Sequence, residues 1–199
     1  MSRNTENPHP PPRGGDLFAE LVEVMRKLRT PVSGCPWDLE QSFETIAPYT
    51  IEEAYEVADA IERRDFGDLK LELGDLLFQS VFHAQMAAEA GLFDIDDVVR
   101  GIVDKMVARH PHVFGDAEIA SAADQTAAWE KMKDDERASR GAGAADRLSA
   151  MDDVANALPA LMRAQKLTKR AARVGFDWPS HHEVIEKLHE ELGELLEAA

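Results

Sequence analysis

Apolar residues recur at three- and four-residue spacing along most of the chain, which is the period of a helix that buries one face. The first such segment begins at Asp16 and ends at Thr30-Pro31, because the residue before a proline leaves the helical region. No segment alternates apolar and polar positions between turns, as a half-buried strand would. The sequence therefore predicts an all-α protein, an antiparallel helical bundle. Its further helices are expected at 48–63, 68–90, 95–109, 124–137, 152–173 and 183–198.

The second and third of these helices have clear end signals. Pro48 is expected to open the second helix, because proline at the first helical position gives up only an N–H that has no partner there. The run Arg64 to Gly67 breaks this helix, and Asp68 is expected to cap the next one. Gly91 is placed to terminate it. Two helices joined by so short a break are expected to fold back as a hairpin.

Composition divides the chain into four expected parts. Residues 1–15 are rich in proline and glycine and have little to bury, so we expect a disordered tail. Residues 16–137 are expected to form a helical domain that carries the acidic residues described below. An alanine- and glycine-rich stretch at 138–150 is interpreted as a linker, and 151–199 as a partial second repeat.

The second repeat emerges when the chain is compared with itself. The segment 35–38, followed by the acidic motif at 52–56, is echoed by 175–178, followed by the acidic motif at 190–194. The helices that precede the two segments also correspond. This pattern indicates a tandem duplication whose second copy stops shortly after its acidic motif.

Four acidic residues occur as two pairs on the second and third helices: Glu53 with Glu56, and Glu72 with Asp75. Residues three apart share a helix face. In one continuous helix Glu56 and Glu72 would be about 24 Å apart. Folding back at the break brings the carboxylates together, and each pair within about 5 Å would repel by roughly 3 kcal/mol at an effective dielectric of 20. A divalent cation relieves this repulsion, and oxygen ligands suit Mg²⁺, with Mn²⁺ as a substitute.

Two other interpretations of these acids stand beside the metal site. The first is a solvated face, since the acids of the second helix lie opposite its apolar stripe. The third helix argues against it, because apolar residues cover most of its circumference and it is therefore expected to be largely buried, where acids need partners. Its narrow polar stripe consists of Glu72, Asp75, Gln79 and His83. The other interpretation of these acids is a di-iron carboxylate centre. Such a centre uses Glu-x-x-His, a motif that neither the second nor the third helix has.

Several side chains elsewhere are candidates for binding a phosphorylated ligand. Lys105 and Arg109 lie one turn apart and can hold phosphate oxygens, although exposed basic pairs often only keep a surface soluble. Trp37 and Trp129 can stack on a base, although most tryptophans are packing residues. Lys133 follows Trp129 by one turn and adds a cation.

Charge and cysteine content narrow the class of partner and compartment. Asp and Glu number 38 against 22 Lys and Arg, which gives a formal net charge of −16. Such a surface repels phosphate backbones and anionic lipid, so neither duplex nucleic acid nor a membrane is the expected partner. The single cysteine, Cys35, excludes an internal disulfide. A cytoplasmic location is therefore expected.

Four motifs occur in order along the chain: Cys35-Pro36-Trp37-Asp38, Glu52-Glu53-x-x-Glu56, Glu72-x-x-Asp75 and Arg109-His110-Pro111-His112-Val113-Phe114-Gly115. Together they resemble the MazG family, the nucleoside triphosphate pyrophosphohydrolases of the all-α NTP pyrophosphatase superfamily. The similarity runs from about Leu17 to Lys133 and resumes at about Leu158.

The resemblance implies Mg²⁺-dependent cleavage of NTPs or dNTPs between the α- and β-phosphates, with the monophosphate and pyrophosphate as products. It also implies a helical bundle that forms a homodimer. By the family pattern the metal ligands would be Glu53, Glu56, Glu72 and Asp75, with Glu52 as a candidate for activating water. The nucleotide-contacting positions would be Lys105, Arg109 and Trp129, of which Lys105 and Arg109 would hold the outgoing pyrophosphate.

The second copy departs from the family pattern. It carries Glu190-Glu191-x-x-Glu194 but lacks the Glu-x-x-Asp that full-length relatives have there, so catalysis is expected from the first copy. Three alternatives remain at this point: a pyrophosphohydrolase specialised for dUTP or dCTP, one that acts on phosphoribosyl-ATP, and a non-catalytic helical dimerisation module with a fossil metal site.

Overall fold

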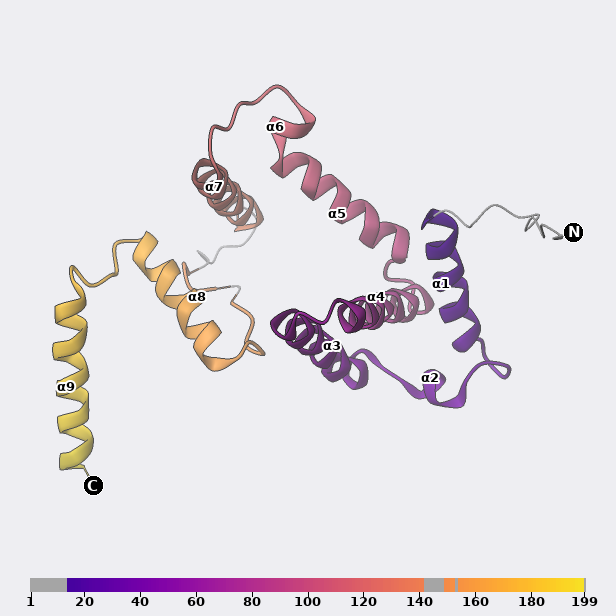
Figure 1. Ribbon diagram of the computed structural model, residues 1–199, viewed down its shortest axis with the longest axis horizontal. Helices are drawn as coiled ribbons and strands as arrows, with labels where there is room; N and C mark the ends of the chain where they lie inside the picture. The colour runs from indigo at the N-terminus through magenta and orange to yellow at the C-terminus, as the bar shows by residue number, and fades with distance from the viewer. Residues whose placement is uncertain (1–13, 142–148, 153, 199) are drawn as a thin grey trace, which may run out of the picture. The chain divides into compact units, whose positions relative to one another are not determined.

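The computed structural model describes residues 14–141, 149–152 and 154–198, with side chains omitted for 133–141 (Figure 1). These residues form helices joined by turns and loops, so the predicted all-α class is confirmed. The helices are α1 (Gly14–Leu28), α2 (Pro36–Glu40), α3 (Phe43–Arg63), α4 (Phe66–Glu89), α5 (Ile95–Arg109), α6 (Pro111–Phe114), α7 (Ala122–Gly141), α8 (Ala160–Arg173) and α9 (His181–Glu197). The short helices α2 and α6 occupy segments where the sequence predicts loops.

The chain forms two compact units, Met1–Glu118 and Ile119–Ala199. This division falls before α7, whereas the sequence places that segment in the first domain. Of the predicted linker 138–150, the first part continues α7 through Gly141, and 142–148 lie outside the described residues. The predicted tail at 1–15 also lies outside them, apart from Gly14 and the residue after it, which begin α1. Both segments therefore stay predictions.

The hairpin of α3 and α4 is the central element of the first unit, and its helices begin earlier than the sequence predicts. Ser42 caps α3 by accepting a hydrogen bond from the Thr45 backbone N–H, while the Thr45 hydroxyl accepts one from the Ser42 N–H. This capping box starts the helix upstream of Pro48, which lies inside α3 rather than at its first position. Asp65, not Asp68, caps α4, because its carboxylate accepts from the backbone N–H of Gly67 and of Asp68.

The turn between the two helices is short and has a left-handed residue. Arg64 adopts φ 57°, and its N–H donates to the carbonyl of Ala60, which closes α3. The Arg63 guanidinium forms ion pairs with Asp59, at 2.6 Å, and with Asp68, so it links the end of α3 to the start of α4. The predicted break is confirmed at Arg64 and Asp65, whereas Phe66 and Gly67 already belong to α4, and the two helices lie side by side.

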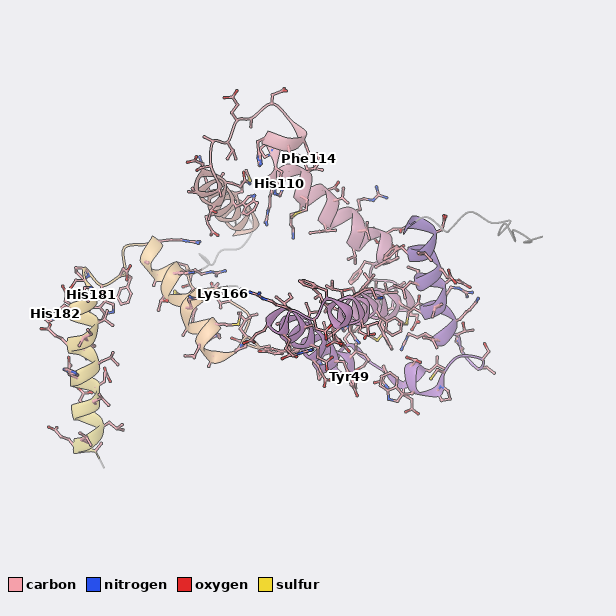
Figure 2. The ribbon with its side chains drawn as sticks, viewed as in Figure 1. Tyr49, His110, Phe114, Lys166, His181 and His182 are labelled. Carbon is pink, nitrogen blue, oxygen red and sulfur yellow. The ribbon has the colours of Figure 1, made fainter. Side chains whose placement is uncertain are left out.

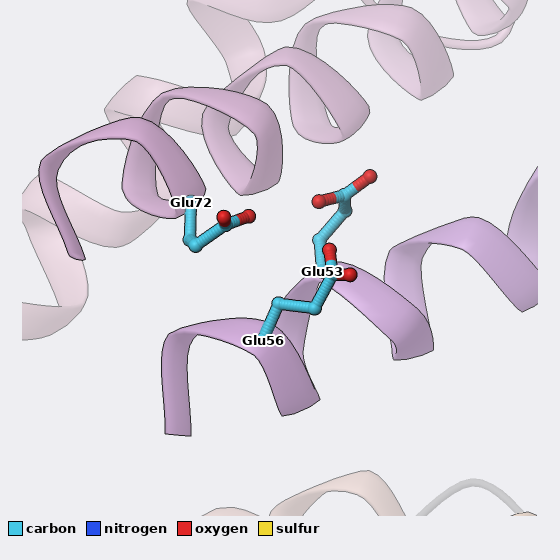
Figure 3. A group of neighbouring side chains, drawn as sticks. All are labelled: Glu53, Glu56 and Glu72. Atoms are coloured by element: carbon cyan, nitrogen blue, oxygen red, sulfur yellow. The ribbon is translucent and has the colours of Figure 1, made fainter. Parts of the chain in front are cut away.

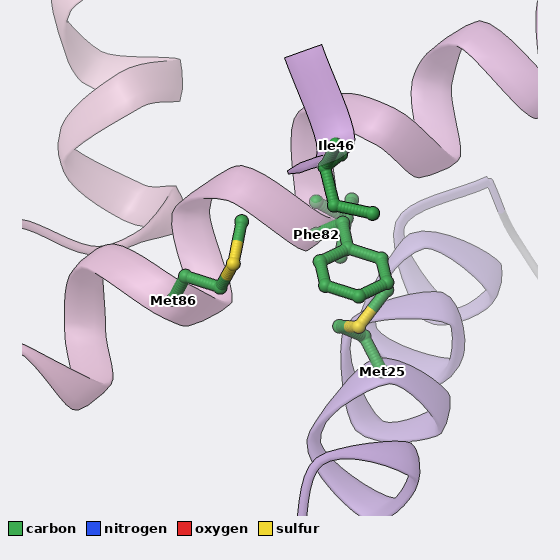
Figure 4. Close-up of a cluster of buried hydrophobic side chains, with 5 residues drawn as sticks. Met25, Ile46, Phe82 and Met86 are labelled. Atoms are coloured by element: carbon green, nitrogen blue, oxygen red, sulfur yellow. The ribbon is translucent and has the colours of Figure 1, made fainter. Parts of the chain in front are cut away.

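The hydrophobic core of the unit lies at the opposite end of the hairpin from this turn. It joins α1 to the start of α3 and to the second half of α4 (Figure 4). Its buried members are Met25, Ile46, Val81, Phe82 and Met86. The core therefore fixes the open end of the hairpin, whereas near the turn Ala60 is the only buried residue among those described on α3 and α4.

Arg29 ties three segments to this core. Its side chain is only 8% exposed, and its Nη2 lies 2.7 Å from Glu89 Oε2 at the end of α4. Its Nη1 donates to the backbone carbonyl of Asp38 in α2, and its guanidinium carbon lies 5.5 Å from the centre of the Phe82 ring. One cation thus connects α1, α2 and α4.

The prediction that α4 is buried around most of its circumference is wrong for its first half. Leu71, Leu73 and Leu77 are 58%, 50% and 43% exposed, whereas the buried residues of α4 begin at Gln79. The first unit has too few helices to cover this half. Among the described residues no helix is long and apolar enough to cross a membrane.

The second unit repeats part of this pattern. Gly175, at φ 84°, ends α8 and allows the Phe176 N–H to donate to the Ala171 carbonyl at 3.0 Å. Arg173 forms an ion pair with Glu130 on α7. The acidic helix α9 follows, as the internal repeat predicts.

Replacing Glu89 with glutamine is expected to destabilise the protein in a pH-dependent way. The hydrogen bond from Arg29 lowers the pKa of Glu89, so the stabilisation is present above the unfolded-state value, near 4.5, and is lost as the pH falls through the lowered folded-state value. We expect Glu89→Gln to lower the free energy of unfolding by about 1 kcal/mol at pH 7, because it removes the charge partner of the buried Arg29. The effect is modest because the Glu89 side chain is 35% exposed and water screens its charge. Urea unfolding at pH 7 and at pH 3 measures this.

The exposed Glu62 on α3 provides the control, because Glu62→Gln removes the same charge without removing a partner of Arg29. A Glu89→Gln loss that is as large at pH 3 as at pH 7 would contradict the ion pair as its cause.

Candidate metal centre

Three carboxylates from the two helices of the hairpin converge near its turn (Figure 3). Glu53 and Glu56 project from α3 one turn apart, and Glu72 projects towards them from the first turns of α4. One carboxylate oxygen from each lies within 4.8 Å of the others. These three residues, here called the acidic trio, are the ones that the sequence predicts to meet when the chain folds back.

Asp75, the fourth predicted ligand, and Glu52, the candidate for activating water, lie outside the trio. Asp75 is exposed, yet its charge acts on Glu53, so it lies beside the trio without joining it. Glu52 is also exposed, on the neighbouring face of α3. The structure thus brings together three of the four predicted ligands.

The electrostatics of the trio are those of uncompensated like charges. The pKa of Glu53 is raised by removal from water, then by the charges of Asp75 and Glu56, by hydrogen bonding to Glu56 and by the charge of Glu72. The pKa of Glu72 is raised by removal from water, then by Glu56, Asp68 and Asp75. Among the described residues the nearby cation, Arg63, pairs with other acids.

The donor set fits a hard divalent cation. All three groups offer carboxylate oxygen, and neither sulfur nor imidazole belongs to the cluster. Mg²⁺ and Mn²⁺ prefer such ligands, and Mg²⁺ needs only a few of them because it keeps several waters. A cation would supply the positive charge that the described side chains do not.

The second copy of the repeat arranges its acids differently. On α9 Lys187 pairs with Glu190 at 2.7 Å and with Glu191 at 3.2 Å. The residue of the first copy that corresponds to Lys187 is Tyr49, which has no charge. In the described part of the chain no lysine pairs with the corresponding acids of the first copy, whereas a lysine pairs with those of α9.

Trp37 lies next to an aromatic residue that the sequence analysis missed. Its ring packs edge-on against Tyr49, with ring centres 6.1 Å apart, and both side chains are about half exposed. Tyr49 precedes Glu53 by one helical turn and so lies on the same stripe of α3 as the trio. The spacing Tyr49-x-x-x-Glu53 could have indicated that Tyr49 lies on the same helix face as the trio, but only after Glu53 is identified as part of a site.

The other predicted ligand-binding residues lie apart from the trio or are not placed against it. Lys105 is exposed and Arg109 half-buried on α5, which leaves from the far end of α4 (Figure 1). Figure 2 shows His110 and Phe114, beyond the end of α5, well away from Tyr49. Trp129 and Lys133 belong to α7 in the second unit, and the Lys133 side chain lies outside the described set. Their contacts with a ligand stay predictions.

Replacing Glu53 with glutamine is expected to stabilise the metal-free protein. The raised pKa of Glu53 means that its charge opposes folding at neutral pH, because stability is lost as the pH rises through the folded-state value. We expect a gain of roughly 0.5 kcal/mol at pH 7 in EDTA, a small value because solvent screens the cluster. Urea unfolding of Glu53→Gln beside the exposed control Glu62→Gln measures it, and a loss of stability specific to Glu53→Gln would contradict the repulsion.

Comparison with known proteins identifies the family of this chain. The model of the MazG nucleotide pyrophosphohydrolase domain matches residues 41–114, which include the whole trio. A nucleoside triphosphate pyrophosphohydrolase of Escherichia coli (strain K12) is 53% identical over 176 residues, covering 88% of this chain and 65% of that protein. The nucleoside triphosphate pyrophosphohydrolase/pyrophosphatase MazG of Thermotoga maritima is 44% identical over 184 residues, covering 92% of this chain and 68% of that protein.

A solved structure is also similar. The crystal structure of a mazG-related protein from Thermotoga maritima aligns with 58% of this chain and 98% of its own, at 29% identity and a TM-score of 0.49. The chain spans 65% of the length of its Escherichia coli relative. From the sequence identity to these relatives and the matched domain, the chain belongs to the MazG nucleotide pyrophosphohydrolase family.

Proposed function

We propose that this chain hydrolyses nucleoside triphosphates, ribo- or deoxyribo-, to the monophosphate and pyrophosphate with the help of Mg²⁺. The observation that carries the proposal is the acidic trio, whose oxygens gather within 4.8 Å without a basic partner among the described residues. The names of the relatives support a pyrophosphohydrolase. Triphosphates suit such a site because they arrive with bound divalent cations, so the acidic surface does not repel them.

Glu53, Glu56 and Glu72 would hold the metal, and Asp75 would join them as the fourth carboxylate. An Mg²⁺ ion held by these carboxylates would supply positive charge to the phosphates and would lower the pKa of a water bound to it. The oxygen of water forms a bond to the α-phosphorus while the bond from that phosphorus to the bridging oxygen breaks. Glu52 is the nearby carboxylate free to take up the proton of this water, and pyrophosphate leaves.

The exposed pair of Trp37 and Tyr49 would receive the base. Aromatic faces stack on any base, so this pair favours broad tolerance over recognition of one base. Tyr49 lies one turn from Glu53 on α3, so a base stacked on this pair would lie near the trio. Lys105, Arg109, Trp129 and Lys133 are proposed to contact the nucleotide as well.

The chain is further proposed to act as a homodimer. One side of α5 exposes a continuous row of apolar residues, and so does the first half of α4. Exposed apolar faces of this extent mark interfaces, and a second copy offers the same faces in return. The residues on α5 are Val98, Val99, Ile102, Val103, Met106 and Val107.

The reaction products are the most direct test of the proposed activity. Incubation of ATP and dATP with the protein and Mg²⁺ is expected to give monophosphate and pyrophosphate in equal amounts, and none in EDTA. Glu56→Gln should lower kcat/KM by at least about 100-fold, because it removes an assumed metal ligand, whereas Glu62→Gln, on the exposed surface of the same helix, should not. Ion-exchange chromatography of the products measures this.

The outcomes separate the alternatives. Diphosphate and orthophosphate would contradict the bond that we assign. Turnover of only dUTP or dCTP, or of phosphoribosyl-ATP, would narrow the substrate to a specialist's. The absence of any product would favour the dimerisation module.

Charging the apolar face of α5 is expected to separate the subunits. Ile102→Asp places a carboxylate in the middle of the exposed row, where burial in an interface costs several kcal/mol. Light scattering should report a dimer for the wild type and a monomer for the variant, with the helical circular dichroism retained. Arg100→Asp on the same helix is the matched control, and a dimer that survives Ile102→Asp would exclude this face.

A further inference from the structure

Gln79 is a buried polar residue for which the fold provides no partner. Its side chain is 91% buried, since only 9% of its surface is exposed, and its Oε1 is buried without a hydrogen bond to any described residue. An amide oxygen removed from water without a partner is destabilising, so a residue of this kind is retained for a reason other than packing.

The position of Gln79 on α4 directs it towards the acidic trio. Gln79 follows Glu72 by seven residues, so the two project within about 20° of each other, and it follows Asp75 by one turn. Long side chains on a helix lean towards its N-terminus and cover the preceding turn. A glutamine at position 79 can therefore extend over the turn that carries Asp75.

The neighbour on the other side of Gln79 is already engaged. His83 Nε2 lies 3.0 Å from the Thr50 hydroxyl, and the His83 ring stacks on Phe43 with ring centres 5.9 Å apart. On the polar stripe of α4, the remaining neighbour of Gln79 at one-turn spacing is Asp75. Asp75 is also the one predicted ligand that stays outside the trio.

We infer that Gln79 is a positioning residue, which holds Asp75 in place when that carboxylate joins Glu53, Glu56 and Glu72 around the metal. In this arrangement the Gln79 amide turns towards Asp75, its Nε2–H donates to one carboxylate oxygen, and Oε1 leaves its buried position. The other oxygen of Asp75 then faces the trio. This inference rests on the metal site of the proposed function and adds a residue to it.

The same helix already contains a hydrogen bond of this type. Gln85 Nε2 donates to Glu89 Oε1 at 2.9 Å, across one helical turn. A hydrogen bond from a neutral amide to a metal-bound carboxylate fixes its orientation, and loss of such a bond usually weakens metal binding about 10- to 100-fold. A residue that merely filled space would show no such link to metal.

The experiment measures Mn²⁺ binding by isothermal titration calorimetry and electron paramagnetic resonance, without nucleotide. The variants are Gln79→Leu, Asp75→Asn, the double variant and the control Gln85→Leu. We expect Gln79→Leu to raise the Kd at least 10-fold and Gln85→Leu to leave it within about twofold. The double variant should bind no more weakly than Asp75→Asn, because Gln79 acts through Asp75.

Thermal unfolding in EDTA gives a second readout. Gln79→Leu should raise the Tm by about 2–4 °C, because leucine removes an unpaired buried amide, so weaker metal binding cannot be ascribed to misfolding. Unchanged Mn²⁺ binding in Gln79→Leu, or additive losses in the double variant, would overturn the inference. If the wild type itself binds no Mn²⁺ and matches Glu53→Gln, the metal site of the proposed function fails instead.

Discussion

Mutual repulsion among the carboxylates at the turn of the α3–α4 hairpin is the constraint around which the first unit is organised. Removal from water, followed by the charges of neighbouring acids, raises the pKa of Glu53 and of Glu72, so folding holds these charges together at a cost in stability. The stabilising interactions lie elsewhere: the core of Met25, Ile46 and Phe82 is at the other end of the hairpin. Packing at one end thus sustains an unfavourable charge arrangement at the other, which is typical of a site kept for chemistry.

Each end of the hairpin is held by a small set of hydrogen bonds and ion pairs. Arg29 joins the end of α1 to α4 through Glu89 and to α2 through the Asp38 carbonyl. Arg63 joins the last turn of α3 to Asp68 at the start of α4. With the helices joined at both ends, the backbone positions of Glu53 and Glu72 stay side by side. The divalent cation of the proposed function would offset the repulsion between their carboxylates.

The apolar residues left exposed on α4 and α5 relate the hairpin to its surroundings. Leu73 on α4 and Ile102 on α5 belong to faces that the first unit has no helix to cover. Lys105 and Arg109 lie on the same α5, which leaves from the end of α4, whereas Glu72 of the trio lies near the start of α4. The proposed dimer would account for both features, because one contact would bury the apolar faces and set basic residues of one subunit beside another surface.

Much of this unit could be predicted from the sequence, because its signals are local. Helical periodicity located α5, the break at 64–67 fixed the hairpin, and the spacing of Glu53, Glu56 and Glu72 indicated which carboxylates meet. Helix starts were predicted less well, since the capping box at Ser42 competes with Pro48 and only the folded backbone shows which signal prevails. The pattern of α4 indicated burial, but a sequence does not state whether the covering surface belongs to the same chain.

The sequence by itself determined which acids share a helix face, because that depends only on 3.6 residues per turn. Tertiary structure alone decided which of them converge: Asp75 stays outside the trio and Tyr49 packs against Trp37 beside it. It also decided that Gln79 has no partner for its buried oxygen. These are contacts between helices, set by how two separate segments approach each other, and no local spacing encodes that distance.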